Sequence, residues 1–121
     1  MSSAGVDCLF CRIVAGQIPC DKLYEDDHVL AFRDIQPQAP EHFLIIPKRH
    51  IATLDDIEDT DAQLIGHLFV VNRRITRQLN LAGSGYRTVF NCRGDGVQLV
   101  FHIHLHVLAG RRMTWYILEW R

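Results

Sequence analysis

The sequence predicts a single α+β domain in which an antiparallel sheet packs against one long helix. Short strand-like runs are separated by turn-forming residues, one long amphipathic segment stands among them, and no linker or repeat divides the chain. A length of 121 residues corresponds to about one domain. Strands grouped around a single main helix favour an antiparallel sheet. We therefore expect one domain over residues 1–121.

The first part of the chain predicts a short helix followed by two strands. The helix covers 8–15 and ends at Gly16 and Pro19, since both residue types interrupt helices. The strands cover 22–25 and 29–34, and the two aspartates between them form a turn.

The middle of the chain predicts a loop, a buried strand and the long helix. Two prolines in 35–40 lack the N–H groups that a β-ladder needs, so this segment is a loop. The apolar run 43–47 predicts a buried strand. The helix covers 60–80, and Asp61 can cap or charge its start. Apolar residues recur on this helix at helical spacing: Leu64, Leu68, Val71, Ile75 and Leu79.

The last part predicts two strands, over 86–91 and 99–108. The glycine-rich segment 83–85 ends the long helix before the first of them. The turn-forming residues 93–96 lie between the two strands and connect them.

Charge and apolar content argue against several classes of function. Thirteen Lys and Arg against fourteen Asp and Glu give a net charge of −1 without a basic stripe, which argues against a nucleic-acid partner. No apolar run is long enough to span a membrane, and residues 1–7 lack the pattern of a secretory signal. We therefore expect a cytoplasmic protein whose four cysteines are reduced or bind metal.

The segment Phe101-His-Ile-His-Leu-His-Val107 is the strongest functional signal. On a strand, successive side chains point to opposite faces, so His102, His104 and His106 are predicted to share one face. Phe101 and the other apolar residues of the run would then face the core. Three of seven histidines within five residues favour function over an ordinary exposed face. Two interpretations remain open: a metal site, or a nucleophile with neighbouring proton carriers.

With other motifs, this segment resembles the histidine triad family, and specifically its Hint-like branch of nucleoside phosphoramidases. The similarity runs from about Leu9 to Trp115. The motifs that carry it are Ala31-Phe-Arg-Asp-Ile35, Pro37-Gln-Ala-Pro40, His42-Phe-Leu-Ile-Ile-Pro-Lys-Arg-His50, Gly66-His-Leu68 and His102 to Leu108.

The resemblance implies a fold, an assembly and a mechanism. The fold is an α+β sheet domain that pairs into a two-fold homodimer through the long helix and the strand at 86–91. His104 attacks the α-phosphorus of a nucleotide derivative, and water hydrolyses the nucleotidyl-histidine. His106 contacts a phosphate oxygen and assists the leaving group, and His102 completes the triad. No organic cofactor is expected.

The resemblance also implies a binding site for a purine nucleotide. Two amides face the phosphate and one carboxylate faces the ribose hydroxyls: Asn91, Gln98 and Asp34. The base lies in an apolar slot formed by Ile18, Phe32 and Ile35. The remaining histidines, His28, His42 and His67, are interpreted as structural.

The pair Cys8-x-x-Cys11 has two interpretations. A thioredoxin-type redox pair needs a βαβ context, which is missing, whereas zinc favours such a pair completed by two histidines. Galactose-1-phosphate uridylyltransferases and several bacterial triad proteins have a similar pattern, which implies a structural zinc site formed by Cys8, Cys11, His50 and His102. The alternative is a plain pair of thiols.

The chain departs from its family near the expected phosphate site. Arg93 and Val97 stand where glycines are common, and Leu99 stands where Ser or Thr would donate to phosphate or leaving group. Residues 116–121 form an atypical apolar tail with an extra tryptophan. These departures support an alternative hypothesis, in which a re-tasked or engineered scaffold binds another small molecule or forms a protein interface and hydrolyses nucleotides weakly or not at all.

Overall fold

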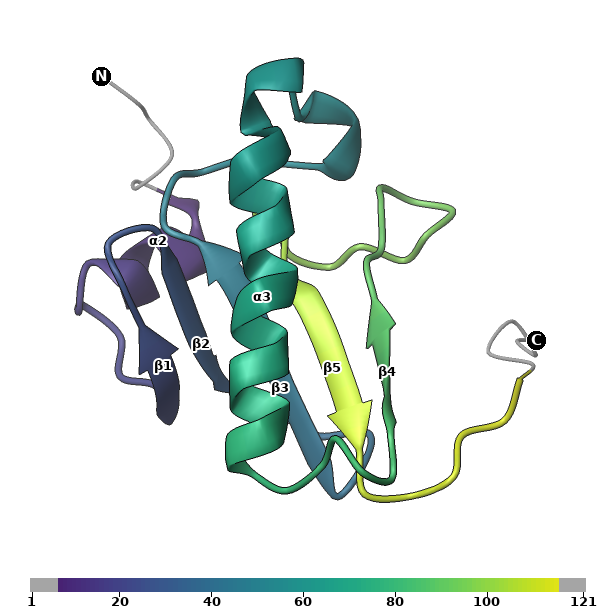
Figure 1. Ribbon diagram of the computed structural model, residues 1–121. Coiled ribbons are helices and arrows are strands. Elements are labelled where there is room, and N and C mark those ends of the chain that lie inside the picture. Colours follow the sequence, from purple (N-terminus) through teal and green to yellow (C-terminus); the bar gives the residue numbers. More distant parts are fainter. Residues whose placement is uncertain (1–6, 116–121) are drawn as a thin grey trace.

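The computed structural model describes residues 7–115 and shows a five-stranded antiparallel sheet crossed on one face by one long helix (Figure 1). The strand order is β1-β2-β3-β5-β4. The elements are α2 (Leu9–Val14), β1 (Lys22–Glu25), β2 (Val29–Arg33), β3 (Glu41–Pro47), the 3-10 turns η1 (Leu54–Asp56) and η2 (Asp59–Asp61), α3 (Ala62–Gln78), β4 (Tyr86–Val89) and β5 (Leu105–Ala109). This arrangement confirms the predicted α+β fold.

The main core lies between the sheet and α3. One face of the helix and alternate residues of three strands are fully buried there. This follows from the helical repeat of about 3.6 residues and from the alternation of side chains along a strand. These residues are Val29, Ala31, Phe43, Ile45, Leu68, Val71, Ile75, Leu105 and Val107. Since β3 and β5 form the centre of the sheet, the positions of their outward-facing residues are fixed by this core.

A second, smaller core covers part of the opposite face of the sheet. Phe10 of α2 packs there on residues of β2 and β3. The buried members are Phe10, Leu30, Phe32, Leu44 and Ile46. This cluster includes no buried residue of β4 or β5. Near those two strands, the same face of the sheet therefore has room for polar side chains.

The long helix is slightly shorter than predicted. It begins at Ala62, after η2, and ends at Gln78, before Asn80 with a φ of 60°. Asp61 precedes the helix but does not cap it through its side chain. Its carboxylate instead accepts from the backbone N–H of Glu58 and pairs with Arg49. Asp61 therefore occupies the N-cap position without a capping hydrogen bond from its side chain, and the prediction that it caps or charges the helix start is met by its charge.

The final strand begins later than predicted, at Leu105 rather than Leu99. The chain before it bends to follow the segment after β3, and the N–H of Ile103 donates to the carbonyl of Ile51 over 2.8 Å. Phe101 is consequently 49% exposed instead of facing the core, whereas His102 and His104 are buried. The alternation expected of one long strand therefore fails upstream of Leu105.

The predicted strand over 86–91 is also shortened and ends at Val89. Within residues 7–115, no helix combines the length and apolar character needed to cross a bilayer. The atypical tail over 116–121 lies outside the described residues.

Candidate functional site

The histidine run separates into two sites instead of sharing one face. The rings of His104 and His106 lie side by side, with centroids 4.8 Å apart. The ring of His102 is fully buried and lies among Cys8, Cys11 and His50. Both interpretations of the run therefore have a physical counterpart in the structure, a pair of adjacent imidazoles and a potential metal site.

The tautomer of His104 is fixed by the backbone. Its Nδ1–H donates to the carbonyl of His102 over 2.8 Å, and a carbonyl can only accept. The lone pair of the neutral ring is therefore on Nε2. Burial lowers the pKa of His104 below its ordinary value, so the neutral form is favoured near pH 7. A neutral imidazole with a free Nε2 lone pair is the form that can act as a nucleophile.

His42 belongs to the site, although its interpretation from sequence was structural. Its Nδ1 accepts from the backbone N–H of Gln38 over 3.0 Å, so the neutral ring carries its proton on Nε2. That Nε2–H donates to His106 Nδ1 over 2.9 Å and lies 3.4 Å from an oxygen of Asp34. His106 accepts at Nδ1 and therefore carries its own proton on Nε2, where it can donate to a substrate.

This chain of hydrogen bonds distinguishes proton chemistry from metal binding. Asp34, His42 and His106 place ligand-type atoms within 4.8 Å of one another. However, a metal at His42 Nε2 would displace the proton that the Gln38 contact keeps there. Burial also brings the pKa of His106 to about 4 and lowers that of His42. Because the Gln38 contact keeps a proton on His42 Nε2, the group is suited to ordering neutral imidazoles rather than to holding an ion.

The second site is the Cys/His cluster, defined here as Cys8, Cys11, His50 and His102. His102 Nδ1 lies 3.3 Å from Cys8 Sγ and 3.5 Å from Cys11 Sγ, and His50 Nδ1 lies 3.4 Å from Cys11 Sγ. With Zn–S bonds of about 2.3 Å and Zn–N bonds of about 2.0–2.1 Å, tetrahedral geometry separates S and N ligand atoms by about 3.6 Å. The three S–N distances lie close to this value, and all four ligand atoms lie within 4.8 Å of one another.

The protonation of the cluster also suits a metal. His102 Nε2–H donates to the carbonyl of Pro47 over 2.7 Å, which leaves the Nδ1 lone pair directed at the two sulfurs. Such a second hydrogen bond is the usual way in which proteins orient a histidine ligand. Burial and the neighbouring Cys8 raise the pKa of Cys11 to about 12, so a bound cation would be needed to stabilise its thiolate.

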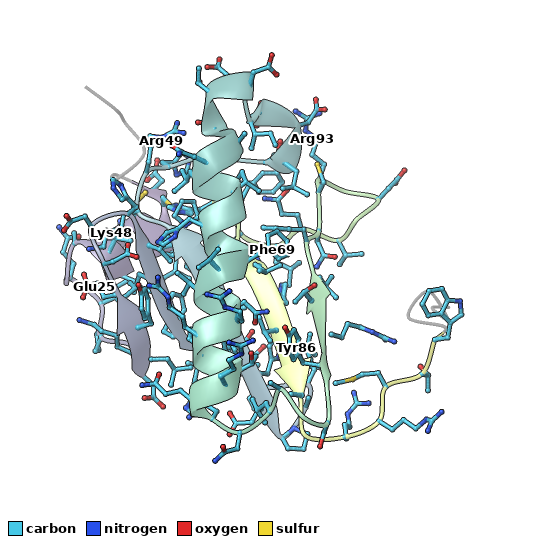
Figure 2. The ribbon with its side chains drawn as sticks, in the orientation of Figure 1. Glu25, Lys48, Arg49, Phe69, Tyr86 and Arg93 are labelled. Atoms are coloured by element: carbon cyan, nitrogen blue, oxygen red, sulfur yellow. The ribbon has the colours of Figure 1, made fainter. Side chains whose placement is uncertain are left out.

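The loop after β4 has the backbone of a glycine-rich turn without all of its glycines. Arg93 and Val97 have φ values of 57° and 59°, in the left-handed region that glycine adopts at no steric cost. Val97 and Leu99 are 65% and 83% exposed. Arg93 (Figure 2) pairs with the carboxylates of Asp55 and Asp56. The departures noted in the sequence thus place Arg93 and Val97 in a strained backbone conformation, and they leave Val97 and Leu99 as exposed apolar side chains.

The amides expected at the phosphate differ in their surroundings. Asn91 is half-buried just beyond β4. Gln98 is buried, its Oε1 accepts from the N–H of Arg93, and its Nε2 donates to the carbonyls of Ala52 and Val100. Both N–H groups of the Gln98 amide are therefore already used, and this side chain orders the loop.

The residues expected around the nucleoside lie on two neighbouring segments. Phe32 is buried and its ring packs edge-on against Phe10 at 5.6 Å. Ile35 is 94% exposed, Ile18 is half-buried, and Asp34 accepts the N–H of Gln36. An exposed isoleucine after a buried strand offers apolar surface that a flat ligand could cover.

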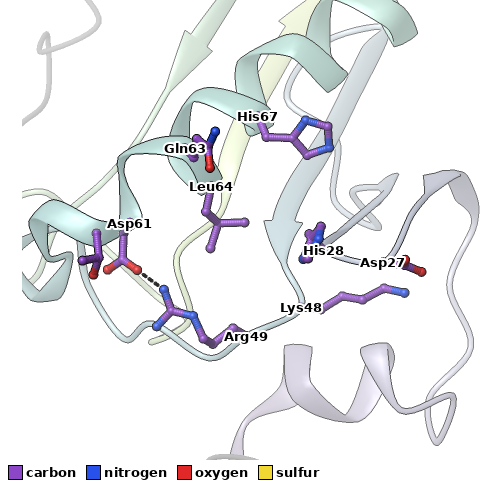
Figure 3. A pocket seen from close by; sticks show the side chains of 9 residues that line it. Asp27, His28, Lys48, Arg49, Asp61, Gln63, Leu64 and His67 are labelled. Carbon is purple, nitrogen blue, oxygen red and sulfur yellow. Dashed lines mark hydrogen bonds and ion pairs between the residues drawn. The ribbon is translucent and has the colours of Figure 1, made fainter.

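A cavity of about 580 Å³ lies at the N-terminal part of α3, away from the histidines of the candidate site (Figure 3). His28, Lys48, Arg49 and His67 contribute to its lining, and His42, His104 and His106 do not. His67 Nε2–H donates to Asp26 over 2.6 Å, which ties α3 to the turn after β1. Most charged groups there are already paired, so size alone does not make this cavity the reactive site.

Residues 15–113 match the HIT domain. The chain is 45% identical to the purine nucleoside phosphoramidase of Escherichia coli over 85% of this chain and 87% of that protein. It is 50% identical to the HIT family hydrolase of Legionella pneumophila, with a TM-score of 0.89 over 91% of this chain and 98% of that one.

A histidine triad protein of Clostridium difficile is 43% identical, with a TM-score of 0.91 over 96% of this chain and 99% of that chain. Sequence and structure thus agree over nearly the full length, and the relatives include hydrolases. The chain belongs to the HIT domain family.

Proposed function

We propose that this protein is a hydrolase that cleaves nucleoside phosphoramidates or related nucleotide esters through a nucleotidyl intermediate on His104. The observation that carries the proposal is the hydrogen bond from His104 Nδ1–H to the His102 carbonyl, because it leaves Nε2 free to attack. The 45% identity to a purine nucleoside phosphoramidase supports this class of substrate. The proposed ligand is accordingly a purine nucleotide. The proposed compartment is the cytoplasm.

The proposed reaction has two steps. Nε2 of neutral His104 attacks the α-phosphorus, and the bond from phosphorus to the leaving nitrogen or oxygen breaks as the leaving group takes up a proton from solvent. His106 Nε2–H donates to a phosphate oxygen and stabilises its developing charge. Water then attacks the phosphorus, breaks its bond to His104 and releases the nucleoside monophosphate. Asn91 is proposed near the phosphate, Asp34 at the ribose, and Ile18, Phe32 and Ile35 at the base.

Intact mass spectrometry tests this proposal directly. The protein is mixed with an adenosine phosphoramidate, quenched within milliseconds to seconds, and weighed. We expect a transient adduct of one adenylyl group that peptide mapping places on His104. Hydrolysis without any adduct, or an adduct on another residue, would contradict the nucleotidyl-histidine mechanism.

We also propose that the Cys/His cluster binds one structural zinc ion. Its support is the donor set of two sulfurs and two nitrogens, their spacing, and the orientation of His102 by Pro47. Four protein ligands leave no open position, so the ion would stabilise the fold and would not contact the substrate.

A homodimer through α3 and β4 is the proposed assembly. β4 is an edge strand of the sheet, with one side unpaired within the described chain. Phe69 of α3 and Tyr86 of β4 (Figure 2) are 43% and 40% exposed. An exposed strand edge beside apolar side chains is a surface that a second copy can cover.

The pH dependence should follow the shifted histidines. Burial lowers the pKa of His104 and brings that of His106 to about 4, so both remain neutral at pH values where a free imidazole is protonated. We expect kcat/KM to stay level as pH falls from 8 through neutrality, with an acid limb below the ordinary histidine value of about 6.5. Steady-state rates in constant-ionic-strength buffers measure this, and an acid limb centred near 6.5 would contradict it.

Replacing His42 should slow the reaction without abolishing substrate binding. In His42→Ala the tautomer of His106 is no longer fixed, and the backbone N–H of Gln38 loses its acceptor. We expect kcat to fall about a hundredfold with a smaller change in KM, the range typical of disrupted acid–base groups. The exposed histidine at position 28 supplies the control, since His28→Ala should leave both constants unchanged. Equal effects of the two variants would argue against a role for His42.

The alternative hypothesis, a re-tasked site with weak hydrolysis, is favoured by the exposed apolar residues of the loop. Val97→Gly removes a β-branched residue from the left-handed region, and Leu99→Ser supplies a donor. We expect the double variant to raise kcat/KM about tenfold, below the roughly hundredfold effect of one donor in a preorganised oxyanion site. If the parent is already a fast phosphoramidase and the variant is no faster, the departures are tolerated variation.

A further inference from the structure

We propose that the Cys/His cluster and Phe10 position His104, so that metal binding at the cluster sets the tautomer and orientation of the nucleophile. This inference rests on the proposed role of His104. Two separate contacts connect the cluster to the nucleophile, one through the backbone of His102 and one through the ring of Phe10.

His102 belongs to both sites at once. Its imidazole is held between the carbonyl of Pro47 and the sulfurs of Cys8 and Cys11, and it is fully buried. Its own carbonyl accepts the Nδ1–H of His104 over 2.8 Å. A movement of the whole His102 residue when metal binds or leaves would therefore also move the acceptor that fixes the proton of His104.

Phe10 forms the second connection. It stands between the two cysteines in the sequence, on the short helix α2. Its ring meets His104 edge-on, with centroids 5.1 Å apart and an interplanar angle of 89°, and it lies 5.9 Å from the ring of His102. The helix that would hold the metal thus also supports one side of the nucleophilic ring.

The helix depends on its anchors because it is very short. α2 has six residues, and an isolated helix of that length is not stable in water. Phe10 is its only buried residue, and the cluster attaches it to the chain at His50 and His102. Without metal, the thiols lose their shared partner, and both Phe10 and the His102 carbonyl gain freedom. The proton of His104 can then move to Nε2, which removes the attacking lone pair.

The test reads the tautomer of His104 directly. Long-range ¹H–¹⁵N spectra of labelled protein at neutral pH distinguish Nδ1–H from Nε2–H, and His104→Asn assigns the signals. The samples are zinc-loaded protein, chelated protein, zinc-loaded Phe10→Leu, Cys8→Ser and, as the matched control, Cys20→Ser. Cys20 is half-buried against the same small core but lies outside the cluster.

We expect Nδ1–H alone in zinc-loaded protein and in Cys20→Ser, and a mixture of tautomers in the other three samples. In those three, kcat should fall about tenfold or more while KM changes less than about twofold, because misorientation affects the reaction more than binding. Phe10→Leu should retain its zinc, which separates positioning from metal loss.

Several outcomes would overturn the inference. These are a failure to take up metal, or a single Nδ1–H form in both the chelated protein and Phe10→Leu. If the metal-free protein does not fold, zinc-loaded Phe10→Leu decides alone, and an unchanged tautomer and kcat reject the proposal. A zinc-loaded protein with His104 in one tautomer that forms no nucleotidyl adduct would instead contradict the proposed function and leave the positioning intact.

Discussion

His104→Asn should reduce the hydrolysis of an adenosine phosphoramidate at least a thousandfold. The substitution removes the nucleophilic Nε2 while the asparagine amide can still donate to the His102 carbonyl. Loss of a nucleophile removes the covalent route entirely, and the remaining rate comes from binding and charge stabilisation alone. Single-turnover kinetics with product detection measure the loss, and the adenylyl adduct should disappear with it.

His104→Ala is the less suitable variant. The ring is only 8% exposed and packs against Phe10 and His106, so truncation leaves a cavity and an unpaired carbonyl. We expect His104→Ala to be inactive and also less stable, whereas His104→Asn is inactive and better folded. Activity in His104→Asn above a few percent of the parent would place the nucleophile elsewhere.

Removing the proposed zinc should produce the largest change in stability. We expect metal analysis to find one zinc per chain, and chelation or Cys8→Ser to lower the free energy of unfolding by about 3 kcal/mol or more. Structural zinc contributes about 10–16 kcal/mol in zinc-finger peptides, which have little other core. Here the core between α3 and the sheet involves none of the four ligands, so the loss should be partial.

Thermal unfolding followed by circular dichroism measures this loss. A decrease of about 3 kcal/mol corresponds to roughly 10 °C or more in Tm for a domain of this size. Most of the sheet signal should persist at low temperature in the metal-free protein, because α2 lies outside the main core. Cys20→Ser is again the control. A protein that contains no zinc and whose Tm is unaffected by chelator would reject the metal site.

The sequence predicted the fold well where periodicity decides the structure. β1 occupies the predicted residues, and α3 lies within the predicted helix. These elements follow from alternation and from apolar spacing, both of which are local. The start of β5 is different, because the hydrogen bond from Ile103 to the Ile51 carbonyl belongs to the tertiary structure and leaves no local signal.

The site could be predicted only as far as residue types allow. The four residues of the Cys/His cluster do lie together, as the family resemblance implied. The hydrogen bond between His42 and His106 was not predicted, because it depends on the pairing of β3 with β5, which puts Leu44 opposite His106. The tautomers depend on Gln38 and on the His102 carbonyl. Nearly every residue has the same backbone N–H and C=O groups, so the sequence does not reveal which of them will contact a histidine.

The strand order has a consequence for how the site is assembled during folding. β1, β2 and β3 are neighbours in both sequence and sheet, so their pairing closes only short loops. β5 pairs instead with β3 across about half of the chain, as in the pairing of Ile45 with Leu105, and such distant pairings form slowly.

β5 also inserts between β3 and β4, so the sheet stays divided until it arrives. His102, His104 and His106 enter with that last segment, whereas Cys8, Cys11, His42 and His50 are already present in the earlier part of the chain. During synthesis from the N-terminus, a chain that has emerged only as far as α3 therefore exposes two cysteines and an incomplete ligand set. Under the proposed mechanism, the site is therefore completed only when the last strand completes the sheet.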